Sequence, residues 1–144
     1  MMSVRIITLS GYGFAVCIAL DNSIEHKIHL TMSQNQQYKK CIDACLRAVS
    51  ICNQTAYNCL SEDNALSLKL CIQLNLECAV ICSAAAQVMC MNGRYAEQLC
   101  RMCAEICQAC GDECAKHSSQ HCRLCAEACY QCAEECMQLT EATV

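Results

Sequence analysis

The sequence lacks proline and tryptophan, and it has one phenylalanine and four glycines in 144 residues. Without proline, no residue is obliged to kink or end a helix. So little glycine and proline also argues against the short strands and tight turns of small disulfide-rich scaffolds. The abundant residues include Ala, Leu, Glu, Gln and Met, which favour helices. The composition therefore predicts an all-α protein.

Runs of positive charge are also missing. The net charge is −4, the pI is near 5.5, and the longest basic run is Lys39-Lys40. A nucleic-acid backbone is bound by clustered Lys and Arg, so we expect no nucleic-acid partner. The apolar stretch at residues 6–20 is too short and too interrupted by Ser and Gly to span a bilayer, so we expect no membrane anchor. The apolar stretch leaves export open, although the N-terminal residues contain no twin-Arg motif and no small-residue cleavage site.

Cysteine is what the chain has in excess. There are 19 cysteines, and all but Cys17 lie between Cys41 and Cys136. In the last third they step by three and four residues, first over 100–114 and again over 122–136, and these two segments match at nine of fifteen positions. Steps of three and four place side chains on one face of a helix, in the pattern of a coiled-coil seam. The pattern predicts helices whose buried faces carry thiols.

Four such helices are expected, over residues 34–60, from Ser61-Glu62-Asp63-Asn64 to Asn92-Gly93, over 94–116, and over 119–140. The polar cluster and the Asn-Gly pair are capping signals. Short connections between long helices predict an antiparallel up-down-up-down four-helix bundle over residues 34–144, with a cysteine-lined core. Residues 1–33 form a separate N-terminal extension. Met32 resembles a translation start, in which case the residues before it are not native or are poorly ordered.

The density of thiols favours a metal site over the other roles of cysteine. A single buried cysteine is often a small apolar residue, but 18 on shared faces are too many for that role. Disulfides within a helix fit poorly, because Cβ atoms three or four residues apart are about 5–6 Å apart and a disulfide needs about 3.8 Å. Disulfides between helices stay open for an exported structural bundle. A metal ion bridging neighbouring thiolates fits the spacing better.

Charge favours Cu(I) among the metals. A four-thiolate Zn²⁺ site carries a charge of −2, and about four such sites would bury anions beside no Lys or Arg on the inward faces. Cu(I) is soft and accepts two or three thiolates, and bridging sulfur brings the ratio toward one ion per thiolate, which leaves the core neutral. A zinc or mixed-metal thiolate buffer is the alternative. The predicted ligands are Cys41, Cys45, Cys52, Cys59, Cys71, Cys78, Cys82, Cys90, Cys100, Cys103, Cys107, Cys110, Cys114, Cys122, Cys125, Cys129, Cys132 and Cys136.

A helical bundle with repeated Cys-x3-Cys and Cys-x2-Cys steps resembles the bacterial copper storage proteins, over roughly residues 34–140. The resemblance, without a twin-Arg signal, is to the cytosolic branch, and it implies a cytoplasmic homotetramer that loads many Cu(I) ions and catalyses no reaction. It also implies a bundle mouth where His, Met or Asn pass copper inward. The matching residues are His117 and His121 at the third turn, and Asn75 on an inward face. Methionines 89, 91, 102 and 137 are expected toward the opposite end, as weak thioether ligands or as gap fillers.

Overall fold

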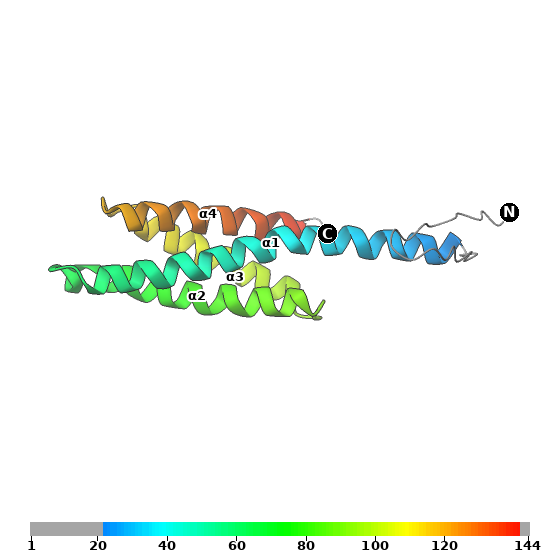
Figure 1. The fold of residues 1–144 in the computed structure, drawn as a ribbon, viewed down its shortest axis with the longest axis horizontal. Helices are drawn as coiled ribbons and strands as arrows, with labels where there is room; N and C mark the ends of the chain where they lie inside the picture. Colours follow the sequence, from blue (N-terminus) through cyan, green and yellow to red (C-terminus); the bar gives the residue numbers. More distant parts are fainter. Residues whose placement is uncertain (1–21, 142–144) are drawn as a thin grey trace, which may run out of the picture. The chain divides into compact units, whose positions relative to one another are not determined.

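The computed structural model describes residues 22–141, and all of its regular structure there is helical (Figure 1). The elements are α1 (Asn22–Leu60), the short 3₁₀ helix η1 (Ala65–Leu68), α2 (Lys69–Cys90), α3 (Ala96–Cys114) and α4 (Gln120–Glu141). The chain divides into two compact units after Gln36, and the bundle belongs to the unit that begins at Gln37. Of the first unit, the structure describes residues 22–36, which are helical.

Contacts between helix ends show that the bundle is antiparallel. Near the start of α1, Cys41 Sγ lies 3.3 Å from Sγ of Cys136 near the end of α4. The end of α1 meets the start of α4, where Cys59 Sγ lies 3.9 Å from Cys122 Sγ. The start of α2 likewise meets the end of α3. The predicted up-down-up-down bundle with a cysteine-lined core is confirmed.

The predicted start of the first helix at residue 34 is wrong, because α1 begins at Asn22. The prediction followed the cysteine pattern, which starts at Cys41. Helix formation is local, however, and no Gly or Pro stands between Gly13 and Gly93 to interrupt it. Glu25 in the first turn also complements the positive end of the helix dipole. The apolar stretch 6–20 and Cys17 lie outside the described residues.

The Asn-Gly pair ends α2 as predicted, with Asn92 as the left-handed residue. Asn92 has a φ of 48°, and its amide donates to the Met89 carbonyl at 3.0 Å. The Gly93 amide donates to the Val88 carbonyl at 2.9 Å. These two bonds make a Schellman motif, which satisfies carbonyls that the helix end leaves free. The polar cluster at 61–64 acts differently from the prediction, since Asn64 makes no side-chain cap hydrogen bond.

Small residues let the four helices approach closely. The buried positions of the bundle are almost all Cys or Ala, with Met89, Leu68 and Leu139 as the larger apolar side chains. Thr55 and Asn75 are the buried polar residues of the described chain. Sulfur, rather than branched aliphatic carbon, therefore occupies the centre of the bundle.

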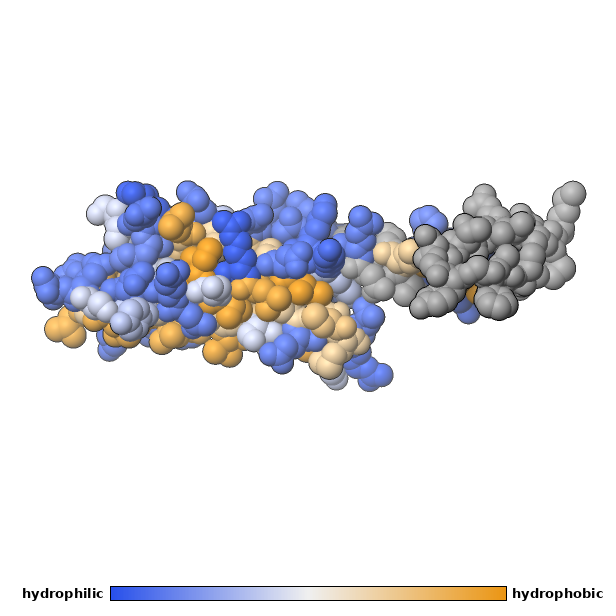
Figure 2. All heavy atoms as spheres, in the orientation of Figure 1, coloured by the Kyte–Doolittle hydropathy of each residue, from blue (hydrophilic) through white to orange (hydrophobic). Residues whose placement is uncertain are grey.

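The outer face of α2 is apolar as well. Leu70, Leu76 and Val80 are 52%, 47% and 68% exposed, and hydrophobic spheres gather along the lower edge in Figure 2, where Figure 1 shows α2. Together with its buried face, this makes Ala65–Cys90 long and apolar enough to span a membrane by length and composition alone. One third of the 18-residue apolar window within it is buried inside the bundle, and length and composition alone do not separate a membrane span from a helix packed in a protein core.

Candidate metal centre

Seventeen of the eighteen described cysteines are buried, and all eighteen are free thiols. They come from all four helices. The buried set comprises Cys41, Cys45, Cys52 and Cys59 of α1, Cys71, Cys78 and Cys82 of α2, Cys100, Cys103, Cys107, Cys110 and Cys114 of α3, and Cys122, Cys125, Cys129, Cys132 and Cys136 of α4. The steps of three and four therefore do turn these side chains inward.

Cys90 is the exception among the predicted ligands. It is exposed, whereas its neighbour Met89 is buried. Successive residues of a helix are about 100° apart around its axis, and Cys90 is one position off the inward track. The structure therefore does not bring Cys90 together with the other thiols.

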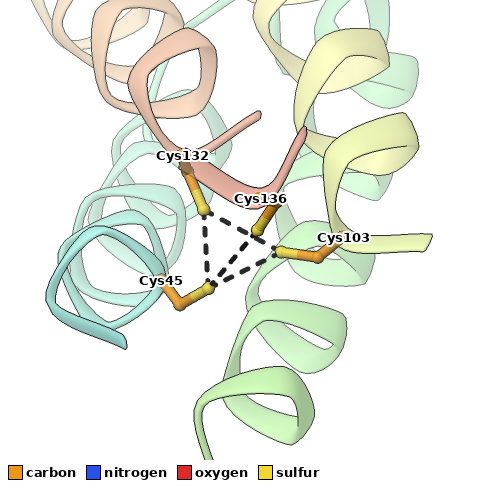
Figure 3. A group of neighbouring side chains, drawn as sticks. All are labelled: Cys45, Cys103, Cys132 and Cys136. Atoms are coloured by element: carbon orange, nitrogen blue, oxygen red, sulfur yellow. Dashed lines mark hydrogen bonds between the residues drawn. The ribbon is translucent and has the colours of Figure 1, made fainter. Parts of the chain in front are cut away.

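The thiol sulfurs lie in groups that are compact enough to bind one metal ion. In Figure 3, four sulfurs from α1, α3 and α4 converge. Cys45 Sγ lies 3.8 Å from Cys103 Sγ, 4.0 Å from Cys136 Sγ and 3.7 Å from Cys132 Sγ. All four sulfurs lie within 4.8 Å of one another. One ion between them would touch ligands from three helices.

Neighbouring groups share members, so the sulfurs form a continuous network. Cys103 and Cys132 belong both to the group in Figure 3 and to a second group with Cys82 and Cys107. A third group of four contains Cys52, Cys110, Cys125 and Cys129, and Cys41, Cys100 and Cys136 form a trio. Cys78 joins the second group to the third, because its Sγ lies 3.5 Å from Cys107 Sγ and 4.0 Å from Cys129 Sγ. Shared ligands are what bridged thiolate clusters need.

Hydrogen bonding among the thiols sets their protonation. Hydrogen bonding with Cys103, Cys132, Cys136 and Cys41, in that order of effect, lowers the pKa of Cys45. At the end of α1 the balance is opposite: burial, then the negative charge of Cys122, raises the pKa of Cys59 to about 12. Because thiolates bind metal and thiols do not, ligands such as Cys59 must release a proton on binding.

Asn75 is buried among the thiols rather than lying at the surface. Its amide donates to Cys114 Sγ at 3.3 Å and to Cys71 Sγ at 3.5 Å, and its Oδ1 accepts from Cys125 Sγ at 2.9 Å. Asn75 is fully buried, as expected of an inward-facing position. It thus joins thiols of α2, α3 and α4 through one side chain, and its oxygen is a potential ligand within the core.

His121 lies against the last thiols of the core. Its Nε2 is 3.5 Å from Cys59 Sγ, 3.2 Å from Ser119 Oγ and 3.0 Å from Glu62 Oε1. The ligand atoms of His121, Cys59 and Cys122 lie within 4.8 Å of one another, close enough for one metal ion to bind all three. The imidazole is partly exposed, at 22%. It therefore joins the thiol core to solvent.

His117 is placed differently from His121. Its Nε2 lies 3.4 Å from Glu113 Oε1 without making a hydrogen bond of good geometry, and that nitrogen is shielded from solvent. It belongs to none of the ligand-sized groups of the described chain. The structure brings together His121 and the thiols, but not His117. The Glu62 carboxylate was missed from sequence, where Glu62 was read only as part of a capping cluster; its position three residues after Cys59 was the available signal.

These features define a class of protein: a four-helix bundle whose core is a continuous store of soft thiol ligands, with a histidine and a carboxylate at one end. Comparison with known proteins gives the particular family. A sequence profile described as copper storage protein matches residues 34–141. The chain belongs to the copper storage protein family, and the resemblance noted from sequence is confirmed.

Solved structures and a sequence relative agree with this assignment. A Cu(I)-bound copper storage protein, BsCsp3, is 40% identical, with a TM-score of 0.70 over 72% of this chain and 98% of its own. A cytosolic copper storage protein from Streptomyces lividans, solved with five coppers, is 37% identical, with a TM-score of 0.73 over 76% of this chain and 96% of its own. The cysteine-rich protein YhjQ of Bacillus subtilis (strain 168) is 42% identical over 57% of this chain and 77% of its own.

Proposed function

We propose that this protein stores Cu(I), and thereby detoxifies it, by binding many ions to the seventeen buried thiols of the bundle. The observation that carries the proposal is the continuous thiol network in a core where Thr55 and Asn75 are the buried polar residues described. With no Lys or Arg buried there, a bound metal has to neutralise the thiolates itself. Cu(I) does so when sulfurs bridge neighbouring ions. Storage of this kind involves no catalytic turnover.

A zinc or mixed-metal buffer is the competing proposal, because the four-thiol groups also suit a tetrahedral ion. The group of Cys52, Cys110, Cys125 and Cys129 is fully buried and compact enough for one. Each Zn²⁺ bound by four thiolates leaves a charge of −2 in the core, and no buried cation offsets it among the described residues. Charge therefore favours Cu(I).

Anaerobic titration of the fully reduced protein with Cu(I), in competition with a chelator, separates the two proposals. Copper storage predicts saturation well above the roughly four ions that tetrahedral zinc sites allow. Saturation at four or fewer Cu(I) ions per chain would contradict it. As matched variants, Cys103→Ala removes a thiol shared by two groups and should lower capacity, whereas Cys90→Ala removes an exposed thiol and should not.

We propose that copper enters at the His121 end. Support comes from the partly exposed imidazole that touches Cys59, and from Glu62 beside it. His117 lies four residues before His121, and its Nε2 is 3.4 Å from Glu113 Oε1. We therefore propose that His117 shapes this mouth, and that His121 is the residue that first passes copper to the core. Asn75 lies further in, between the mouth thiols and Cys125.

The protein is further proposed to form a homo-oligomer, a tetramer by family resemblance, through the outer face of α2 and α3. A groove of about 700 Å³ lies there, lined by Leu76, Val80, Ile81, Met102, Ile106 and Ala109 together with Glu77 and Glu105. Burying such a face on a second copy removes apolar surface from water. Val80→Glu should reduce the mass measured by light scattering, and an unchanged mass would contradict the proposed interface.

We also propose a cytoplasmic location, supported by the Streptomyces lividans relative, which is described as cytosolic. Cell fractionation tests this, and recovery in the exported fraction would contradict it. Residues 1–33 are proposed as an extension outside the storage function, since the family profile begins at residue 34. A chain that starts at Met32 should then bind as many Cu(I) ions as the full chain.

A further inference from the structure

Among the described residues, one thioether reaches the thiol core, at the end opposite His121. Met89 is 1% exposed, and Cys100 Sγ donates a hydrogen bond to its Sδ at 3.5 Å. Met91, Met102 and Met137, in contrast, are 71%, 50% and 46% exposed. Of the methionines expected to gather at this end, Met89 is therefore the one placed against a predicted metal ligand.

Cys100, the hydrogen-bond donor to Met89, belongs to a group of thiols compact enough to bind one metal ion. Cys100 forms a trio with Cys41 and Cys136, whose own Sγ atoms are 3.3 Å apart. Met89 adds a fourth sulfur, supplied by α2, to three thiols supplied by α1, α3 and α4. The end of the core thus has one sulfur donor from each helix of the bundle.

Charge explains why a thioether is useful at this position. A Cu(I) ion bound by three thiolates carries a net charge of −2. A fourth thiolate would raise this to −3, whereas a thioether adds a fourth soft donor without further charge. The surroundings offer no compensation, because no Lys or Arg is buried in the described part of the chain. Buried, uncompensated charge is costly, so a soft donor without charge stabilises an ion here.

Apolar side chains are also buried at the Met89 end of the core. Ala96, one turn before Cys100, is 1% exposed, and Leu139, three residues after Cys136, is 3% exposed. Unlike the His121 end, this end therefore has a ligand set that is buried throughout. A gap-filling role alone would need a side chain of this volume, but it would not need sulfur within hydrogen-bonding distance of a thiol.

We propose that Met89 Sδ is a ligand of the soft monovalent cation held by Cys41, Cys100 and Cys136. On binding, each of the three thiols that become ligands loses its S–H proton to the solvent, and the ion takes the place of the Cys100 proton between Cys100 Sγ and Met89 Sδ. No atom is oxidised or reduced in this exchange. The proposal rests on Cu(I) storage as the function, and it adds a non-cysteine ligand to the store.

Silver NMR tests this ligand directly, because Ag(I) is a soft monovalent ion with the same filled d shell as Cu(I). The full-length reduced protein, labelled with ¹³C at the methionine methyl groups, is loaded anaerobically with ¹⁰⁹Ag(I), and ¹H–¹⁰⁹Ag correlations are recorded. A correlation arises only through a metal–sulfur bond. We expect the Met89 methyl and the Cys100 β protons to correlate with the same silver ion.

Two variants assign and control the result. Met89→Leu keeps the volume nearly constant, and it should remove the methyl correlation and weaken Cu(I) retention while lowering capacity by at most one ion. Met91→Leu removes an exposed thioether two residues away, and it should leave the correlation in place. Silver bound to Cys100 without a Met89 correlation would overturn the proposal and leave storage intact. Absence of silver from all the cysteines would contradict storage itself.

Discussion

The two ends of the thiol core are built from different side chains. At one end Cys59 and Cys122 meet His121, which is partly exposed and lies beside the Glu62 carboxylate. At the other end Cys41, Cys100 and Cys136 meet Met89, which is buried. Nitrogen and oxygen donors near solvent exchange ions and protons readily, whereas a buried thioether does neither. The comparison indicates a store with one open end and one closed end.

The largest expected effect comes from placing the same charge at each end. Met89→Lys buries an ammonium group that has no partner and should destabilise the reduced apo protein by about 3–5 kcal/mol. His121→Lys places the same group near solvent and within reach of Glu62, and should cost about 1 kcal/mol or less. Urea unfolding under reducing conditions measures both values. Equal losses would mean that the two ends do not differ in burial.

The pH dependence of copper binding should also distinguish the thiol Cys59 at one end from the thioether Met89 at the other. The pKa of Cys59 is raised to about 12 by burial and by negative Cys122, so Cys59 is protonated from pH 6 to 9 and must lose its proton to bind Cu(I). Apparent affinity at this thiol should then rise about tenfold per pH unit. A thioether has no proton to lose.

Chelator competition between pH 6 and 9 tests this difference with two variants. Cys59→Ala should reduce the pH dependence of Cu(I) binding, whereas Met89→Leu should leave it unchanged. A steeper or equal dependence in Cys59→Ala would show that the proton is released elsewhere.

Replacing both histidines should slow copper transfer without emptying the store. We expect His117→Ala with His121→Ala to slow uptake and removal about tenfold, in line with the cost of losing groups that orient or support ligands. Capacity should stay nearly the same, because the seventeen buried thiols remain. Stopped-flow transfer from a Cu(I) chelator measures the rates, with the Cys90→Ala variant as control. Unchanged rates would remove the histidines from the copper route.

A smaller effect is expected from Glu62→Gln. The carboxylate lies 3.0 Å from His121 Nε2, the same nitrogen that lies 3.5 Å from Cys59 Sγ. The amide keeps the size and loses the charge, so uptake should slow by about twofold to threefold, within the range of an exposed ion pair. If Glu62→Gln slows uptake as much as loss of both histidines, the carboxylate is itself a principal ligand.

Much of this structure was predictable because its signals are local. The three- and four-residue cysteine steps of α3 and α4 define their inward faces, and Asn92-Gly93 defines the end of α2. The start of α1 was missed because the cysteines mark a buried face and not a helix boundary. Contacts such as Glu62 with His121 join residues far apart in sequence. They depend on how the turns meet in three dimensions, which residue spacing does not record.

Cys90 and Asn75 show how sharply periodicity decides burial. Cys90 is one position away from the inward track, and it is exposed. Asn75 lies on the track and is fully buried, although it is polar. Its hydrogen bonds to Cys114 and Cys125 follow from the relative rotation of three helices. A single sequence gives the face of each helix, but not that rotation.

The central claim is that the whole thiol core is one Cu(I) store. Copper anomalous scattering from crystals of the reduced protein, loaded anaerobically, tests it most directly. We predict a row of copper ions running between the Cys59–Cys122 end and the Cys41–Cys136 end, each bound by two or more of the buried thiols. Four or fewer ions, or ions confined to the surface around Cys90, would contradict it.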